Sequence, residues 1–396
     1  MELSRRVQNI KPSPTLAVSA RAAQLKAEGR DIIGLGVGEP DFDTPEHIKA
    51  AGIDAIHKGF TKYTAVGGTP SLKQAVVNKF KRENGLDYHA KEVLVSCGGK
   101  QSFYNLAQAV INPGDEVIIP APYWVSYPDI VILAEGKPVI IPAGIEQRFK
   151  LSPAQLETAI TPRTKMVVIN SPSNPTGAVY SGDELAALGA VLRQHPQVLI
   201  ASDDMYEHIR MDDAAFVNIL NVCPDLKDRT LVLNGVSKAY AMTGWRIGYC
   251  AGPAAIIAAM DNIQSQSTSN PTSISQVAAE MALNGDQSCI QPMLTAFRER
   301  HRFVVDGLNA IPGVQCVDSG GAFYAFPDVR TAINRLHAAG KLKAANDLAL
   351  TEYLLDHGVA VVPGSAFGAE GYIRLSFATS MANLEAAISR IGKAVA

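Results

Sequence analysis

The sequence predicts an α/β protein with a mostly parallel central sheet in a large domain and a second, smaller α/β domain. Short runs rich in β-branched residues alternate with segments whose apolar residues recur at helical spacing. Polar residues follow several of the predicted strands. The 396 residues also exceed the roughly 250–300 at which a single hydrophobic core stops growing, so we expect two domains.

The larger domain is expected to contain buried strands that alternate with helices. The predicted strands cover residues 93–97, 116–120, 166–170, 198–203, 230–234 and 247–251, and helices are predicted over 101–111 and 182–193. Asn170, Asp203 and Asn234 end three of these strands. Because ligands bind at the carboxyl ends of parallel strands, we expect these three side chains to lie at one site.

The last third of the chain changes character and is assigned to the smaller domain. A charged helical stretch at 295–308 is followed by short predicted strands at 322–327 and 372–376. The expected division is an N-terminal arm and part of the small domain at 1–43, the large domain at 44–296, and the small domain at 297–396. We see neither internal repeats nor a flexible linker, so the domains are expected to pack closely.

Composition narrows the functional classes. A net charge of -2 without a basic stripe disfavours nucleic-acid binding and favours a small polar substrate. The five cysteines form no Cys-x-x-Cys pair and the histidines show no metal-ligand spacing, so we expect neither disulfides nor a metal. The sequence also shows no apolar stretch typical of a secretory signal or a membrane span, so the expected location is the cytoplasm.

A glycine-rich segment at 34–38 invites comparison with a dinucleotide-binding loop. Pro40 and Pro45 follow where such a loop would open a helix, and the spacing of the third glycine is wrong. We therefore interpret the segment as a strand and turn where backbone approaches a ligand.

The most informative segment surrounds Lys238, and it reads Gly-Val-Ser-Lys-Ala-Tyr-Ala-Met-Thr-Gly-Trp-Arg-Ile-Gly over 235–248. Small neighbours leave room for a ligand beside the lysine. Burial near a second cation such as Arg246 lowers a lysine pKa and yields the neutral amine that attacks an aldehyde.

This segment resembles the lysine signature of the fold type I pyridoxal-phosphate-dependent aminotransferases, in the aspartate aminotransferase branch. Three further motifs stand in the family order: Asn-Pro-Thr-Gly at 174–177, Ser-Asp-Asp-Met-Tyr at 202–206, and Ile-Arg-Leu-Ser at 373–376. The resemblance covers nearly the whole chain. It implies a pyridoxal 5'-phosphate cofactor, ping-pong transamination between an amino acid and a 2-oxo acid, and a homodimer with shared active sites.

The resemblance assigns catalytic roles to three residues. Lys238 is similar to the Schiff-base lysine, which also moves a proton at the substrate Cα. Asp203 matches the carboxylate that pairs with the pyridine nitrogen. Tyr206, together with Asn174, matches the groups that hydrogen-bond the phenolic oxygen of the cofactor.

Further cofactor contacts follow from the same resemblance. Gly99, Lys100 and Gln101 open a predicted helix whose N-terminus suits a phosphate, to which Arg246 and Ser237 would also bind. Trp124 is similar to the aromatic residue that stacks on the cofactor ring and borders the substrate. Tyr63 resembles the tyrosine that reaches the phosphate site of the neighbouring subunit.

Substrate contacts are also implied. Arg374 resembles the arginine that binds the substrate α-carboxylate, close to Asn174 and to the backbone of Gly38. Lys100 stands where animal enzymes carry threonine, and a lysine here is similar to the bacterial, thermophile-type subgroup, in which it meets a distal carboxylate. Aspartate with 2-oxoglutarate is therefore the favoured pair.

Two alternatives stay open from the sequence. The same subgroup contains enzymes that act on prephenate or aromatic amino acids, and Lys11, Ser13 and Thr15 lie where such substrates would be sorted. A β- or γ-lyase would share Lys238 and Asp203. Gly235 replaces the serine of the animal-type branch, so some phosphate contacts must differ.

Overall fold

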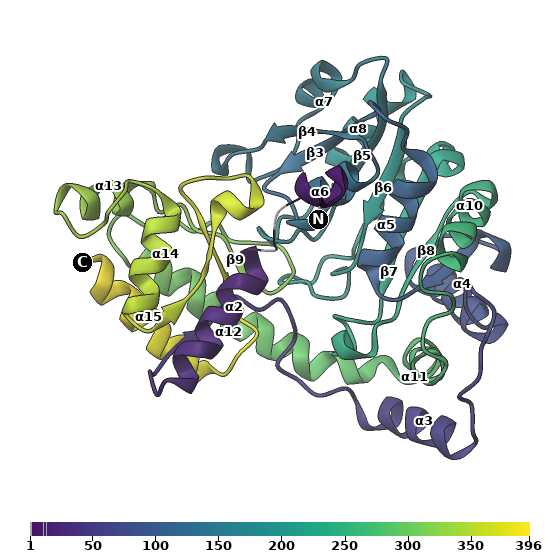
Figure 1. Ribbon diagram of the computed structural model, residues 1–396, viewed down its shortest axis with the longest axis horizontal. Coiled ribbons are helices and arrows are strands. Elements are labelled where there is room, and N and C mark those ends of the chain that lie inside the picture. The colour runs from purple at the N-terminus through teal and green to yellow at the C-terminus, as the bar shows by residue number, and fades with distance from the viewer. Residues whose placement is uncertain (1, 11, 13) are drawn as a thin grey trace.

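A seven-stranded sheet forms the centre of the computed structural model, which describes every residue except 1, 11 and 13 (Figure 1). In spatial order its strands are β2 (Val93–Ser96), β8 (Gly248–Ala251), β7 (Thr230–Gly235), β6 (Leu199–Asp203), β5 (Thr164–Asn170), β3 (Glu116–Ala121) and β4 (Lys137–Pro142). Only β8 runs antiparallel to its neighbours. The predicted α/β class with a mostly parallel sheet is confirmed.

Every predicted strand of this sheet is present, with ends shifted by at most two residues. The edge strand β4 was not predicted, because its sequence Lys-Pro-Val-Ile-Ile-Pro contains two prolines. Proline cannot donate to a strand ladder and is tolerated at a sheet edge, where one side of the strand has no partner. An edge position is where β4 lies.

Helices cover both faces of the sheet, as Figure 1 shows. One core cluster joins the sheet to α4 (Pro70–Asn84), α8 (Gly182–Arg193) and α11 (Ser273–Asn284). A second cluster joins the opposite face to α5 (Gly99–Val110), α6 (Ser126–Leu133) and α10 (Ala254–Ser265). Adjacent residues of β5 alternate between the clusters, since Val167 and Ile169 belong to the first and Met166 and Val168 to the other.

A separate core gathers the C-terminal helices, which are α12 (Gln291–Asn309), α13 (Arg330–Ala338), α14 (Asp347–Asp356) and α15 (Met381–Val395). They pack on a three-stranded sheet of β11 (Val362–Pro363), β12 (Ile373–Ser376) and β9 (Tyr324–Ala325). An N-terminal strand, β1 (Ile33–Gly34), pairs in parallel with β10 (Val359–Ala360) beside this core.

This arrangement supports the proposed division of the chain without fixing its boundaries, which stay a prediction. The pairing of β1 with β10 brings an N-terminal segment to the C-terminal core. The proposed boundary at 296 falls inside α12, a helix that already contributes Met293 and Phe297 to that core.

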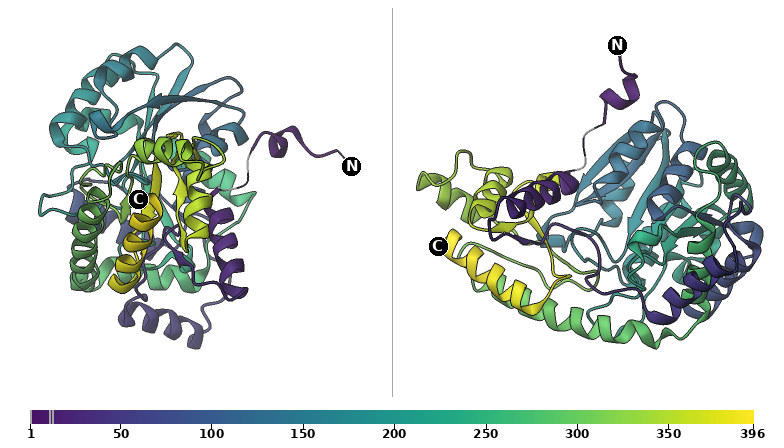
Figure 2. Two further views of the ribbon diagram at one scale, coloured as in Figure 1. Left: turned by 90° about the vertical axis from the view of Figure 1, so that its left-hand side faces the viewer. Right: turned by 60° about the horizontal axis from the view of Figure 1, so that its bottom comes forward.

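The N-terminus leaves the compact body of the protein. Helix α1 (Arg5–Gln8) projects outward in both views of Figure 2, while α2 (Pro14–Ala27) lies along the C-terminal core. An ion pair of 3.2 Å between Arg6 and Glu135 connects α1 to the end of α6. Across the described residues, none of the helices combines the length and the apolar character needed to cross a membrane.

Candidate active site

A cavity of about 390 Å³ opens at the carboxyl ends of β5 and β6 and is bounded on its other side by residues of the C-terminal core. Most of the residues predicted from the sequence line it. Those residues are Thr15, Gly38, Gly99, Lys100, Trp124, Asn174, Asp203, Tyr206, Ser237, Lys238, Arg246 and Arg374. Segments separated by more than 300 residues therefore meet at one cavity.

Two predicted residues in the described part of the chain do not line the cavity. The side chain of Gln101 turns back, accepting a hydrogen bond from the Cys97 amide and donating to Thr268, both at 2.6 Å. Tyr63 is 92% exposed on the surface. Ser13 lies outside the described residues, as does Lys11.

The expectation that Asn234 shares this site with Asn170 and Asp203 is wrong. Asn170 and Asp203 line the cavity, whereas Asn234 is 1% exposed and donates to Glu207 at 2.7 Å on the other side of the sheet end. Successive residues of a strand point to opposite faces, so a strand end does not determine which face its last polar residue uses.

Lys238 follows β7 in a turn and reaches the centre of the cavity. Its ammonium donates to the carbonyl of Gly38 at 2.6 Å and lies 5.8 Å from the centre of the Tyr206 ring. Burial lowers the pKa of Lys238 to about 8; Glu39 opposes this shift, and the positive charge of Arg374 adds to it. A substantial neutral fraction near neutral pH makes this amine a nucleophile and a base.

Asp203 ends β6 with its carboxylate in the cavity wall. Tyr127 donates a short hydrogen bond to one carboxylate oxygen, and the Met205 amide donates to the other at 3.2 Å. Burial raises the pKa of Asp203 above its usual value, while these donors and Lys238 act in the opposite direction. These donors hold the Asp203 carboxylate in place, so it could stabilise a cationic group bound next to it.

Tyr206 and Tyr324 meet across the cavity, with their hydroxyl oxygens 2.7 Å apart. Burial raises the pKa of both phenols, so both are neutral at physiological pH, and one hydroxyl donates to the other. Gly38 lies directly above this pair, and a Cβ added there would stand 2.6 Å from the Tyr324 hydroxyl. A side chain at position 38 would therefore collide with the tyrosine pair.

The N-terminus of α5 faces the cavity beside Arg246. Gly98 caps this helix at φ 89°, a conformation that favours glycine. A Cβ on Gly98 would meet the guanidinium of Arg246 at 2.4 Å. Free amides at a helix N-terminus and an adjacent guanidinium form a site suited to a phosphate group.

Arg374 enters the cavity from β12 and is 2% exposed. It donates to Asn174 at 2.9 Å and to the Gly36 carbonyl at 2.6 Å, and it lies 4.6 Å from the Tyr324 ring centre. Within the described part of the chain its Nε has no hydrogen-bond partner. A buried guanidinium with a free donor is suited to bind a carboxylate.

Lys100 and Trp124 line the cavity next to each other. The Lys100 ammonium lies 5.4 Å from the centre of the Trp124 ring. Burial, together with Arg246, lowers the pKa of Lys100 below its usual value. Thr15, in the first turn of α2, lines the same cavity.

Sequence reasoning missed several residues that line this cavity, chiefly Tyr127 and Tyr324. Tyr127 lies in the first turn of α6, three residues after Trp124, and the two rings meet edge to face with their centres 5.1 Å apart. Tyr324 lies on β9 and neighbours the Arg374 strand in the small sheet. These neighbours could have indicated Tyr127 and Tyr324 only after Trp124 and Arg374 had been assigned to the site.

The site combines a half-buried lysine of lowered pKa, a half-buried carboxylate, a helix N-terminus with an arginine, and a second, buried arginine with a free donor. Together with the mostly parallel sheet, these groups define an enzyme that transfers amino groups. The family model described as aminotransferase class I and II matches residues 30–391, so the chain belongs to this family and is an aminotransferase.

Individual relatives agree with this assignment over the whole length. The chain is 70% identical over 392 residues to the aspartate/prephenate aminotransferase of Nitrosomonas europaea, with 99% of each covered. It is 56% identical over 390 residues to the protein of the same name from Cereibacter sphaeroides, covering 98% of this chain and 97% of the relative.

Solved structures are equally similar. The aspartate aminotransferase from Rhizobium meliloti superposes with a TM-score of 0.94 at 51% identity, covering 100% of this chain and 99% of that one. The aspartate aminotransferase from Thermus thermophilus with maleate gives 0.93 at 43% identity, with both chains covered completely. These structures confirm the predicted fold type and the recognised subgroup.

Proposed function

We propose that the chain binds pyridoxal 5'-phosphate through Lys238 and transfers the amino group of aspartate to 2-oxoglutarate by a ping-pong mechanism. The observation that carries the proposal is the position of Lys238, whose amine of lowered pKa lies between Asp203 and Arg374 in one cavity. Membership of the aminotransferase family supports it.

The residues present fit this cofactor. The absence of side chains at Gly98 and Gly99 keeps the start of α5 open, where its amides, Ser237 and Arg246 would hold the phosphate. Asp203 would pair with the pyridine nitrogen. Tyr206 would donate to the phenolic oxygen.

Two further residues complete the proposed cofactor contacts. Asn174 would donate to the same phenolic oxygen, and Trp124 would cover the ring. When bound, the cofactor supplies an electron-accepting ring that stabilises negative charge at the substrate Cα.

The chain supplies binding, orientation and proton transfer. Arg374 would bind the substrate α-carboxylate through its guanidinium and orient Cα toward Lys238. Lys238, with a pKa of about 8, can accept the Cα proton and return it. The Tyr206–Tyr324 pair and Gly38 would close one side of the site against solvent.

Lys100 supports a dicarboxylic substrate. Its ammonium, next to Trp124 in the cavity, would bind the distal carboxylate while Arg374 binds the proximal one. The Thermus thermophilus relative was solved with maleate, which is itself a dicarboxylate.

Prephenate is the second candidate substrate, because the Nitrosomonas europaea and Cereibacter sphaeroides relatives are named for both aspartate and prephenate. Prephenate also carries two carboxylates. The predicted role of Ser13 and Thr15 in sorting such substrates stays a proposal.

We further propose a homodimer in which Tyr63 reaches the site of the partner subunit. Exposed apolar side chains gather around Tyr63: Ile53 and Ile56 on α3 (Glu46–His57), Phe60 in the following loop, and Met281 on α11, which packs against α3. These five side chains form what we call the α3 patch. An apolar surface of this kind is typical of a protein interface.

A spectroscopic titration tests the proposed function. Purified protein mixed with pyridoxal 5'-phosphate should develop a visible absorption band, and this band should shift when aspartate is added. Lys238→Ala should develop no such band. A wild type that stays colourless with added cofactor would refute the proposal.

Substrate choice requires a separate comparison. Aspartate, glutamate and phenylalanine should be tested as donors against 2-oxoglutarate, oxaloacetate and prephenate. Lys100→Ala should reduce kcat/KM for aspartate by at least tenfold more than for phenylalanine, since only aspartate has a distal carboxylate. Equal losses would remove the role proposed for Lys100.

A further inference from the structure

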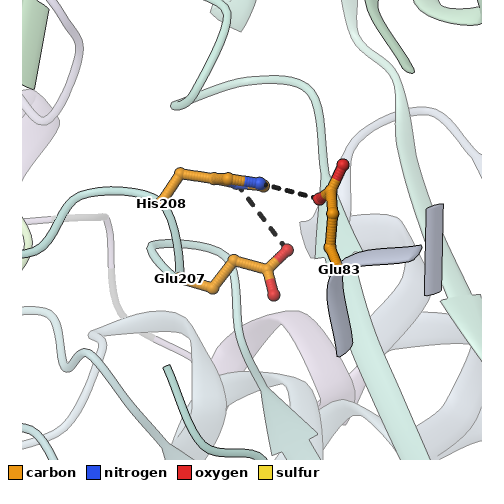
Figure 3. Close-up of side chains that lie close together, drawn as sticks. All are labelled: Glu83, Glu207 and His208. Carbon is orange, nitrogen blue, oxygen red and sulfur yellow. Dashed lines mark hydrogen bonds and ion pairs between the residues drawn. The ribbon is translucent and has the colours of Figure 1, made fainter. Parts of the chain in front are cut away.

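A polar cluster that is buried at Lys79 and Glu207 and exposed at Glu83 lies behind the active site, on the far side of the segment that carries Asp203 and Tyr206. Figure 3 shows three of its members, with His208 between the carboxylates of Glu83 and Glu207. His208 is 2.9 Å from Glu83 and 3.7 Å from Glu207. Such a grouping resembles a set of metal ligands.

A lysine already supplies the positive charge of this cluster. Lys79 on α4 is 0% exposed, and its ammonium donates a short hydrogen bond to Glu207 and lies 3.6 Å from Glu83. It also donates to Asn84 at 2.7 Å. The centre of the cluster is therefore the buried Lys79–Glu207 ion pair, with Glu83 as an accessory carboxylate.

Glu207 connects three separate elements. One carboxylate oxygen accepts from Lys79 and from Asn234 at 2.7 Å, and the other accepts from Asn84 at 2.6 Å. Burial would raise the pKa of Glu207, but Lys79 and the other donors reverse this effect, so its pKa is lowered and it stays ionised. A buried carboxylate with three donors has a fixed position.

Both residues of the Glu207–Asn234 hydrogen bond lie close in sequence to active-site residues. Glu207 follows Tyr206 directly and closes the turn that begins after Asp203, with its amide donating to the Asp204 carbonyl at 2.9 Å. Asn234 lies at the end of β7, four residues before Lys238, and its side chain also accepts from the Gly235 amide at 2.7 Å.

We infer that Glu207, held by Lys79, is a positioning residue that fixes the Asp203–Tyr206 turn relative to the strand end that carries Lys238. None of these polar side chains lines the cavity, so the effect is transmitted through the backbone. The inference rests on the proposed function, because Asp203, Tyr206 and Lys238 must be the groups that contact the cofactor. Displacements of about 1 Å in such groups reduce turnover by up to about a hundredfold.

The length of the Glu207 side chain provides the test. Glu207→Asp keeps the charge but withdraws the carboxylate by about 1.5 Å, one carbon–carbon bond. The apoenzyme should then bind pyridoxal 5'-phosphate at least tenfold more weakly, with reduced visible circular dichroism per bound cofactor. At saturating cofactor, kcat for aspartate should fall at least tenfold while KM changes less than threefold, because Arg374 and Lys100 keep their places.

A second variant covers the case in which Glu207→Asp does not fold. Asn234→Ala removes the connection to β7 but leaves Glu207 paired with Lys79, and the same losses in cofactor affinity and kcat are expected. Two controls accompany it. Glu83→Gln changes the other carboxylate near Lys79. Because Glu83 does not bond to Asn234, this variant should leave both the cofactor affinity and kcat unchanged.

The second control separates positioning from stability. Asn309→Ala removes two side-chain bonds to Cys316 at the far end of α12, so it should lower the melting temperature without affecting cofactor affinity. Wild-type cofactor affinity and kcat in Glu207→Asp or Asn234→Ala would overturn the inference, as would an equal loss in Asn309→Ala. A wild type without a cofactor band would instead refute the proposed function itself.

Discussion

Lys238 combines chemical reactivity with a cost in stability. An ammonium buried beside Arg374 is poorly solvated, and its pKa of about 8 measures that penalty relative to the ordinary value of 10.5. Between these two pH values the folded state binds fewer protons than the unfolded state, so the free energy of unfolding rises with pH. Below about pH 8 the full penalty is present.

Lys238→Met should therefore stabilise the apoprotein. At pH 7 the expected gain is about 2 kcal/mol, reduced from the full shift because Lys238 is partly exposed. The gain should decline between about pH 8 and 10.5. Denaturant unfolding of apoprotein at several pH values measures it, with the exposed Lys341→Met as control. A Lys238→Met chain no more stable than wild type at pH 7 would contradict a desolvation penalty at Lys238.

Gly38 gives a second prediction at the level of the residue. Gly38→Ala would place a methyl group 2.6 Å from the Tyr324 hydroxyl and disturb the Tyr206–Tyr324 pair. We expect kcat/KM for aspartate to fall at least about tenfold. Gly34→Ala is the matched control, because nothing lies within 4 Å of a Cβ there. Comparable activity of the two variants in steady-state assays would argue against a close contact at Gly38.

The sequence predicted the site residues that lie in recognisable motifs and missed those that do not. Lys238, Asp203 and Arg374 were assigned because each lies in a motif that resembles the aminotransferase family, and these motifs stand in the family order. Tyr127 and Tyr324 were not predicted, since an isolated tyrosine in a helix or a strand is most often a core residue. Their partners become known only when distant segments meet, as they do at Asp203 and Tyr206.

Helix α5 is the element on which phosphate binding depends. Gly98→Ala would introduce both a strained φ of 89° and a methyl group 2.4 Å from the Arg246 guanidinium. We expect the affinity for pyridoxal 5'-phosphate to fall by at least about tenfold, whereas the affinity for pyridoxal, which lacks the phosphate, should change little. Absorption titrations with both compounds measure the difference.

Gly114 provides a control that separates backbone strain from the steric clash with Arg246. Gly114 has a similar φ of 87° but nothing within 4 Å of a Cβ, so Gly114→Ala shares the backbone strain alone. It should lose stability, by about 1 kcal/mol, and keep its cofactor affinity. Equal losses of affinity in both variants would show that α5 responds to general destabilisation and not to the phosphate contact.

Among the helices and strands, the sequence pattern predicted the bounds best for strands that are buried on both faces of the sheet. The strands β5, β6 and β7 are buried on both faces and read as continuous apolar runs, and the predicted bounds of α8 match those observed. The edge strand β4 and the short strands of the C-terminal core were harder to predict. β9, predicted over residues 322–327, spans only Tyr324–Ala325, because pairing with β12 determines its length.

The whole molecule brings its two cores together at the active site. Asp203 ends a strand of the seven-stranded sheet and Lys238 lies in the turn after another, whereas Arg374 and Tyr324 come from the small C-terminal sheet. Length and composition predicted two such units, and the proposed division assigned part of residues 1–43 to the smaller one, but nothing in the sequence identified β10 as the partner strand of β1. That pairing connects residues more than 300 positions apart.

The proposed dimer can be tested by mixing two inactive or weakened subunits. If Tyr63 acts across the interface, a hybrid of Lys238→Ala and Tyr63→Ala subunits contains one site with both native residues. Unfolding and refolding the two variants together should therefore restore tight cofactor binding in up to one site per hybrid. Variants refolded separately provide the control, and a mixture no better than their average would place Tyr63 outside the partner's site.

The central claim is that Lys238 and its neighbours perform transamination, and a single-turnover reaction tests it most directly. Cofactor-loaded protein mixed with aspartate alone should release one equivalent of oxaloacetate per subunit and stop, and it should continue only when 2-oxoglutarate is added. Continuous release of ammonia and a 2-oxo acid without any acceptor would contradict the account and identify a lyase.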